Sequence, residues 1–214
     1  MVADKVVKEH NLLICSNGWL PLIEGNPVPT YLQKDDVIAG GKMGVRFEQA
    51  RETTAIGRNE LPSICFYNTQ NFGAIYTDDF IFETAVRNDH KEGSGTCQKT
   101  YVMLQCVDNL IQIPLSAKGC VSDLNLAFTG YYSSGKKEDL SAFGVDFFRY
   151  VKLRVEAKEG KAHVFINDRL AYTISSRINK AKIVSICYFF QGAGSVDYVK
   201  LSNDTVTFND NFDR

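Results

Sequence analysis

The stretch QGAGSVDYVKLSND, residues 191–204, combines two glycines with an alternating run of apolar and polar residues. A phosphate-binding loop needs a strand, a glycine turn and then a helix whose N-terminus faces the anion. Here the glycines at 192 and 194 are followed by SVDYVKL, whose side chains alternate as they do along a strand. The stretch therefore predicts a turn between two β-strands and argues against a nucleotide site.

The same alternation recurs along the chain, and no window shows a sustained helical period. Polar turn residues separate the runs, for example KEGK at 158–161 and NDRL at 167–170. Ten or more strands at this spacing predict an all-β fold, a jelly-roll β-sandwich. The expected strands are 80–88, 99–107, 110–115, 123–132, 150–158, 162–168, 182–190 and 195–202.

One domain over residues 1–214 is the simplest organisation, because the chain has no internal repeat or low-complexity tract. Residues 1–60 are less regular, and we interpret them as edge strands and loops packed on the sandwich. A globule of this length buries roughly 70% of the surface of its unfolded chain. The sequence is therefore long enough for a sizeable core.

Charge and hydropathy exclude two kinds of partner. The chain has 24 basic and 25 acidic residues, so its net charge of −1 gives no summed field to attract nucleic acid. No run approaches the roughly 18–20 apolar residues that span a bilayer, so we expect no direct membrane insertion by this segment. The opening MVADKVVKEHNLLIC has charges where a signal peptide needs an apolar run.

The six cysteines form no C-x-x-C pair and no Cys/His cluster, which argues against a zinc site. Cys15, Cys65, Cys106 and Cys187 lie in apolar strand-like runs, where cysteine acts as a small core residue. Cys97 and Cys120 lie instead in polar, glycine-flanked surroundings and are the candidate disulfide pair. A bridge between them would close a loop of about 24 residues, stabilise the fold by roughly 3 kcal/mol and imply an oxidising compartment.

Six segments across nearly the whole chain carry a resemblance to a known family. They are NGWLPLIEGNPVPTYL (17–32), DDFIFETAVRNDHKEG (78–93), GCVSDLNL (119–126), DLSAFGVDF (139–147), VFINDRLAY (164–172) and GAGSVDYVKLSND (192–204). In order and spacing they resemble a family of bacterial envelope proteins. In that family a C-terminal concanavalin A-like, laminin-G-like sandwich follows a membrane anchor and a PKD-type Ig-like domain.

The resemblance implies a location outside the cytoplasm, in the periplasm or at the cell surface. It also implies that an anchor and a PKD-type domain belong to a longer chain, and a Cys97–Cys120 bridge would suit that compartment. It supplies no catalytic residues that could be carried over to this sequence.

Sandwiches of the lectin and glucanase type commonly present one curved sheet face to carbohydrate. Sugar recognition needs polar partners for hydroxyl groups and an aromatic ring for the apolar face of the sugar. In DLNLAFTGYY, parity places Leu124, Leu126 and Phe128 on one face and the polar residues on the other. The candidate ligand-binding residues chosen in this way are Glu83, Arg87, Gln105, Asp123, Asn125, Tyr131 and Gln191. A solvated outer sheet face is the alternative for each of them.

Catalytic signatures are weak. The E-x-D-x-x-E pattern of glucanases is missing, because Glu83 is followed at the same-face positions by Ala85 and Arg87, and no G-x-S-x-G elbow occurs. We therefore expect a non-enzymatic binding or adhesion module with a glycan or protein ligand. The alternatives are a glycoside-active enzyme with an unrecognised carboxylate pair, or a purely structural envelope domain.

A metal remains one further option, since sandwiches of this type often bind calcium through loop carboxylates. Asp78 and Asp79, directly before the strand expected at 80–88, are the candidate ligands. The alternative is that they cap a turn. No other cofactor is expected.

Overall fold

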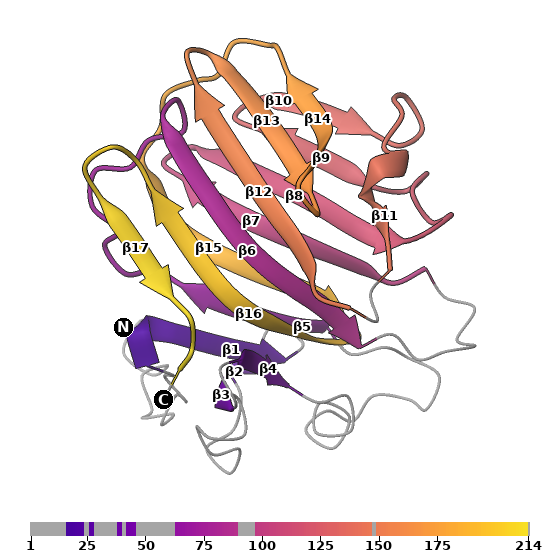
Figure 1. The fold of residues 1–214 in the computed structure, drawn as a ribbon, viewed down its shortest axis with the longest axis vertical. Coiled ribbons are helices and arrows are strands. Elements are labelled where there is room, and N and C mark those ends of the chain that lie inside the picture. Colours follow the sequence, from indigo (N-terminus) through magenta and orange to yellow (C-terminus); the bar gives the residue numbers. More distant parts are fainter. Residues whose placement is uncertain are drawn as a thin grey trace, which may run out of the picture.

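A computed structural model describes residues 16–23, 26–27, 38–39, 42–45, 63–89, 97–146 and 149–213. The strands lie in two sheets, A and B, that face each other (Figure 1). Helix in these ranges is limited to two short 3-10 segments, η1 (Ser16–Gly18) and η2 (Ser141–Phe143). The expected all-β jelly-roll sandwich is confirmed.

Sheet A contains nine strands in the described ranges, in the order β10-β9-β8-β7-β15-β5-β1-β2, with β11 beside β8. Only β11 runs parallel to its neighbour among these pairs. The strands are β1 (Trp19–Ile23), β2 (Asn26–Pro27), β5 (Ser63–Asn68), β7 (Lys99–Cys106), β8 (Asn109–Ala117), β9 (Asn125–Phe128), β10 (Tyr131–Ser134), β11 (Gly144–Val145) and β15 (Ile183–Gln191).

Sheet B contains eight described strands, in the order β14-β13-β12-β6-β16-β4-β3, with β17 beside β16. All of its pairs are antiparallel. The strands are β3 (Ile38–Ala39), β4 (Lys42–Val45), β6 (Phe80–Asp89), β12 (Val151–Lys158), β13 (Lys161–Ile166), β14 (Arg169–Ile174), β16 (Ala193–Ser202) and β17 (Thr207–Asp210).

Two-residue turns with both residues at positive φ close three of the hairpins. Glu159–Gly160 joins β12 to β13 with φ of 53° and 75°, and Asn167–Asp168 joins β13 to β14 with φ of 49° and 64°. Thr129–Gly130, with φ of 43° and 95°, joins β9 to β10 in the same way. Such turns match the twist of the paired strands. The single strand expected at 123–132 is therefore wrong, because this turn divides it into two.

Residues 191–204 carry the chain from sheet A to sheet B. β15 ends at Gln191 in sheet A, β16 begins at Ala193 in sheet B, and Gly192 between them has φ of 95°. Asn88 of β6 donates a hydrogen bond of 3.1 Å to the Gln191 carbonyl at this crossing. The glycine at 192 therefore serves a sheet-to-sheet connection, as the sequence predicted for a turn between strands.

The core lies between the two sheets and is built from the inward side chains of alternating strands. In β15, Tyr188 and Phe190 point inward and are fully buried. Tyr188 shares a hydrogen bond of 2.9 Å with Thr84 of β6, which links sheet A to sheet B. Trp19 is also fully buried, and its indole N–H donates to Asp210 at 3.0 Å. Buried polar groups of this kind are expected to have partners.

Candidate functional site

Three aromatic rings lie on the outer face of sheet A, on strands that are neighbours. Tyr101 of β7 is paired with Phe189 of β15, and their ring centroids are 6.0 Å apart. Phe189 is paired in turn with Cys65 of β5, and Tyr67 lies two residues further along that strand on the same face. All three rings are half-buried, so each keeps part of its surface open. Tyr101 and Phe189 are therefore in contact, and Tyr67 lies diagonal to Phe189 on the same side of the sheet.

Side-chain amides lie beside these rings. Gln105 of β7 accepts a hydrogen bond of 2.5 Å from the Tyr67 hydroxyl. Gln112 of β8 is opposite Met103 and donates to the Asn125 carbonyl at 3.0 Å. We call the seven outward residues of this surface the aromatic face: Tyr67, Lys99, Tyr101, Met103, Gln105, Gln112 and Phe189.

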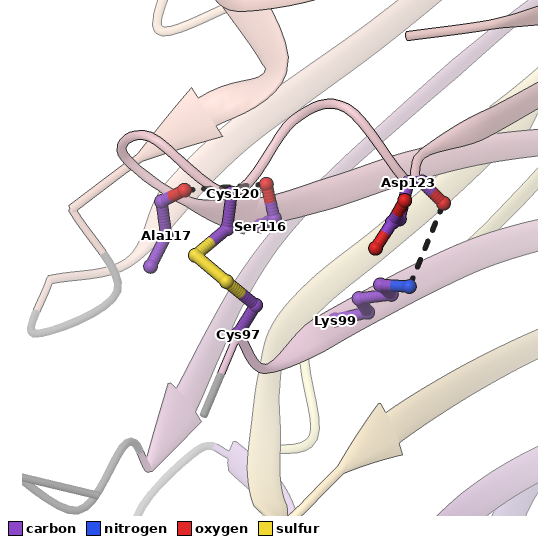
Figure 2. The surroundings of a disulfide bond; sticks show 6 residues. All are labelled: Cys97, Lys99, Ser116, Ala117, Cys120 and Asp123. Carbon is purple, nitrogen blue, oxygen red and sulfur yellow. Dashed lines mark hydrogen bonds between the residues drawn. A yellow bond between two sulfur atoms is a disulfide. The ribbon is translucent and has the colours of Figure 1, made fainter. Parts of the chain in front are cut away.

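The aromatic face is almost free of charge. Lys99 is its only ionised side chain, and none of the seven residues is a carboxylate. The Lys99 ammonium donates to the Asp123 carbonyl at 3.5 Å, beside the aromatic face, as Figure 2 shows. Burial raises the pKa of Tyr101, and the nearby Asp123 carboxylate raises it further. The Tyr101 phenol therefore stays neutral and serves as a hydrogen-bonding group at physiological pH.

A disulfide lies next to Lys99, at one end of the aromatic face. Cys97, two residues before Lys99, is bonded to Cys120, three residues before Asp123, with the Cα atoms 5.5 Å apart (Figure 2). This is the pair that the sequence singled out. The turn after β8 is closed by a hydrogen bond of 3.0 Å from the Cys120 N–H to the Ala117 carbonyl. The bridge therefore fixes the segments that carry Lys99 and Asp123 relative to each other.

The outer face of sheet B differs from the aromatic face, because it carries many charged side chains and several of them form ion pairs. Lys200 lies 3.4 Å from Glu83, and Lys42 lies 3.3 Å from Asp197. Arg154 forms an ion pair with Glu156 and lies 4.1 Å from the centre of the Phe165 ring. Several ionised groups of this face therefore already have partners, although Lys158 and Lys161 lie opposite each other on β12 and β13 as like charges.

The structure places six of the seven predicted binding residues on or beside these two surfaces. Gln105, Asn125 and Gln191 lie on the outer face of sheet A, and Asp123 lies at its border, where its carboxylate is 3.6 Å from Lys136. Glu83 and Arg87 lie on sheet B, where the Arg87 guanidinium is 5.4 Å from the Tyr150 ring centre. The seven residues were predicted as one site because the alternation along a strand shows which side chains face outward, but not which sheet the strand joins.

Tyr131 is placed on the side opposite to the one expected. The turn at Thr129–Gly130 reverses the chain, so Tyr131 is paired with the buried Phe128 and packs against the core. Its hydroxyl donates to the Glu138 carboxylate at 3.0 Å and lies 2.6 Å from the Tyr172 hydroxyl. The side chain that faces outward is Tyr132, which is 74% exposed. Tyr131 therefore belongs to a polar cluster at one end of the sandwich and is not on the aromatic face.

Asp78 and Asp79 lie in the turn before β6, as the sequence placed them. The Asp78 carboxylate is 3.2 Å from the Lys180 ammonium, which also lies 4.9 Å from the Tyr76 ring centre. The described part of the chain contains no group of three His, Cys, Asp or Glu side chains that could hold a metal ion. The calcium site stays a prediction.

Sequence reasoning missed the rings that define the aromatic face. The signal was present in KTYVMLQC, where Lys99, Tyr101, Met103 and Gln105 alternate with four inward residues. It was also present in Tyr188-Phe189-Phe190, which must leave one ring outside the core. The alternation along each strand identifies its outward residues. Only the order of the strands in the sheet shows that the outward rings of different strands lie together.

Comparisons with known proteins assign no family to this chain. No family model and no curated protein matches the chain. Similar solved structures include a carbohydrate-binding module from Bacillus subtilis, 14% identical over 72% of this chain and 84% of that one, with a TM-score of 0.42. An alginate lyase of polysaccharide lyase family 7 is 14% identical over 76% and 77%, with a TM-score of 0.41. A galectin from Caenorhabditis elegans is 12% identical over 66% and 99%, with a TM-score of 0.37.

At TM-scores below 0.5, these similarities assign no ligand or activity to the chain. None of the helices in the described ranges is long and apolar enough to cross a membrane.

Proposed function

We propose that this chain is a non-enzymatic glycan-binding module of concanavalin A-like form, and that the aromatic face of sheet A holds the saccharide. The observation that carries the proposal is the row of Tyr67, Phe189 and Tyr101 on three neighbouring strands, with Gln105 and Gln112 beside it. Rings of this kind stack on the apolar face of a sugar, and amides can both donate to and accept from hydroxyl groups. The combination suits a neutral or weakly charged glycan.

The distribution of charge favours this face over the other one. A sugar hydroxyl on sheet B would have to compete with ion pairs such as Lys200 with Glu83. On the aromatic face the ligand meets one cation, Lys99, so its affinity should depend only weakly on salt. A strongly acidic polysaccharide would instead bind with a steep dependence on salt.

We further propose that the module is displayed outside the cytoplasm, in the periplasm or at the cell surface. The Cys97–Cys120 bridge supports this, because disulfides persist in oxidising compartments. The membrane anchor and PKD-type domain implied by the family resemblance would then tether it to the envelope. A protein ligand in place of a glycan is an outcome that the experiment below distinguishes.

The test is binding of the purified chain to a broad glycan array, with calcium and again with a chelator, followed by calorimetry with the best ligand. Tyr101→Ala and Phe189→Ala each remove about 1–2 kcal/mol of stacking and should weaken binding roughly 5- to 30-fold. Phe165→Ala is the matched control, because it removes a half-buried ring from the outer face of sheet B. Loss of binding in the chelator arm would place calcium in the site.

The other functions make different predictions in the same experiment. A glycoside-active enzyme would release product from the bound polysaccharide, and removal of one carboxylate would stop that release. A protein-binding or purely structural domain would give no signal on the array. Equal losses from Phe165→Ala and Tyr101→Ala would contradict the assignment of the site to sheet A.

A further inference from the structure

Two thiols meet on the outer face of sheet A, beside Tyr67 and Phe189 of the aromatic face. Cys65 of β5 is paired with Phe189 of β15, and Cys187 of β15 is paired with Tyr67 of β5. The two cysteines are therefore diagonal neighbours on adjacent strands, on the same side of the sheet. Cys187 is buried, as expected, whereas Cys65 is only half-buried, and both side chains point away from the space between the sheets.

The sulfur atoms are within reach of a covalent bond. The Cys65 Sγ and the Cys187 Sγ are 2.7 Å apart, and a disulfide bond measures about 2.05 Å. The sulfurs must therefore approach by roughly 0.7 Å, which small side-chain rotations can supply.

We propose that Cys65 and Cys187 form a second disulfide, which joins β5 to β15 beneath the rings of the aromatic face. The bond would link residues 122 apart in the sequence, far more than the 23 of the Cys97–Cys120 bridge. Because β5 also carries β1, the bond would tie the N-terminal strands to the centre of sheet A. It would fix Tyr67 and Phe189, which flank the two sulfurs, relative to each other.

The two cysteines differ in exposure and in pKa, and these differences determine which sulfur reacts first with an oxidant. Cys65 is half-buried and can meet a reagent, whereas Cys187 is only 3% exposed. The hydrogen bond between them lowers the pKa of Cys65 and raises that of Cys187, so the Cys65 sulfur is the nucleophile.

The oxidant we propose is a disulfide, either a small molecule or the oxidised dithiol of an envelope oxidoreductase. The Cys65 thiolate attacks one of its sulfurs, forms a mixed disulfide and releases a thiolate, which takes the Cys187 proton. The Cys187 sulfur then attacks the Cys65 sulfur and releases the second thiolate, which takes from water the proton that Cys65 gave up. Two thiols are oxidised and one disulfide is reduced to two thiols, so protons and electrons balance.

Cys106 of β7 is the natural control, since it is also a cysteine on a strand of sheet A. It is buried, its Sγ lies 3.5 Å from the Leu104 carbonyl, and burial raises its pKa to about 12. We therefore expect it to remain a thiol under conditions that oxidise Cys65 and Cys187.

The experiment incubates the purified full chain with oxidised glutathione, alkylates the remaining thiols under denaturing, non-reducing conditions, and maps the peptides by mass spectrometry. The expected result is a Cys65–Cys187 cross-linked peptide lighter by two hydrogen atoms than the sum of its parts, with Cys106 alkylated. Cys106→Ser should retain the cross-link, and Cys187→Ser should leave Cys65 alkylated or glutathionylated. If both thiols of the wild-type chain are recovered alkylated, or if Cys65 is linked to another cysteine, the proposal is wrong.

Discussion

Substitution of Gly194 by alanine tests the packing of the stretch from which the fold was deduced. Gly194 lies on β16 of sheet B and faces Phe190 of β15, across the space between the sheets. A Cβ at residue 194 would lie 2.1 Å from one ring carbon of Phe190 and 2.5 Å from two others. The φ of Gly194 is not in the left-handed region, so the cost of alanine here is a packing cost.

The size of the effect follows from the distances. Ordinary contact begins near 3.4 Å, so the nearest ring atom must move by about 1.3 Å, from 2.1 Å to 3.4 Å. Phe190 is fully buried and packs edge-on against Phe66 with the ring centroids 6.1 Å apart, so the displacement spreads into the core. Overpacking of this kind costs about 1–3 kcal/mol, and the reduced entropy of the unfolded chain offsets about 0.4–1 kcal/mol of it. We expect a net loss of about 1.3 kcal/mol.

Urea unfolding followed by tryptophan fluorescence measures this loss, because Trp19 is the only tryptophan and is fully buried. A loss of about 1.3 kcal/mol lowers the midpoint by about 0.4 M if m is about 3 kcal/mol/M, and lowers Tm by about 3–5 °C. Phe190→Leu should relieve the clash. The Gly194→Ala/Phe190→Leu double variant should therefore lose less unfolding free energy than the sum of the two single losses, by about 1 kcal/mol or more.

Gly119→Ala is the control, because the added Cβ meets no atom within 4 Å and the cost is confined to the backbone at φ of 83°. Phe190→Leu should give no rescue there. A Gly194→Ala variant within about 0.5 kcal/mol of the wild type, or strict additivity with Phe190→Leu, would refute the packing argument.

Two further predictions concern the disulfide and the carboxylate at the end of the sandwich. Replacing both Cys97 and Cys120 by serine should lower the free energy of unfolding by roughly 3 kcal/mol in urea titrations, and a loss below about 1 kcal/mol would contradict the loop-entropy estimate. Tyr172 donates a hydrogen bond to Glu138, and this bond lowers the pKa of the Glu138 carboxyl in the folded protein. The contact therefore stabilises the fold at pH values above the Glu138 pKa of the unfolded chain. This stabilisation is lost as the pH falls through the Glu138 pKa of the folded protein. Tyr172→Phe should raise the Glu138 pKa in an NMR titration and flatten the acid-side fall in Tm, whereas an unchanged Glu138 pKa would argue against this contact.

The strands could be predicted from sequence because their signal is local. Alternation in SICFYN, KTYVMLQC and VKLRVEAK corresponds residue by residue to alternating burial in β5, β7 and β12. The turn at Glu159–Gly160 was equally visible, because glycine readily adopts positive φ. Thr129–Gly130 was not recognised, because threonine rarely occupies the left-handed region and its flanking residues continue the alternation. That one turn moved Tyr131 to the wrong face.

The candidate site could not be predicted to the same degree, because it depends on which strands become neighbours. β5 and β15 lie more than a hundred residues apart in sequence, yet their pairing brings Tyr67 next to Cys187 and Cys65 next to Phe189. Glu83 and Gln105 were grouped although they lie on opposite sheets. Local periodicity specifies which side of a strand is outward, whereas sheet order is set by the long-range packing of the inward sides.

The two outer faces show how one core can support two different surfaces. Inward residues of both sheets are constrained by the shared core, so only the outward residues are free to differ. On sheet B, pairs such as Lys200 with Glu83 neutralise each other at the surface, where such pairs add little stability. On sheet A, half-buried rings and amides replace the ion pairs although water would favour charge there. An uncharged aromatic row on an outer sheet face gains little for folding, and a ligand that covers it accounts for its composition better than stability does.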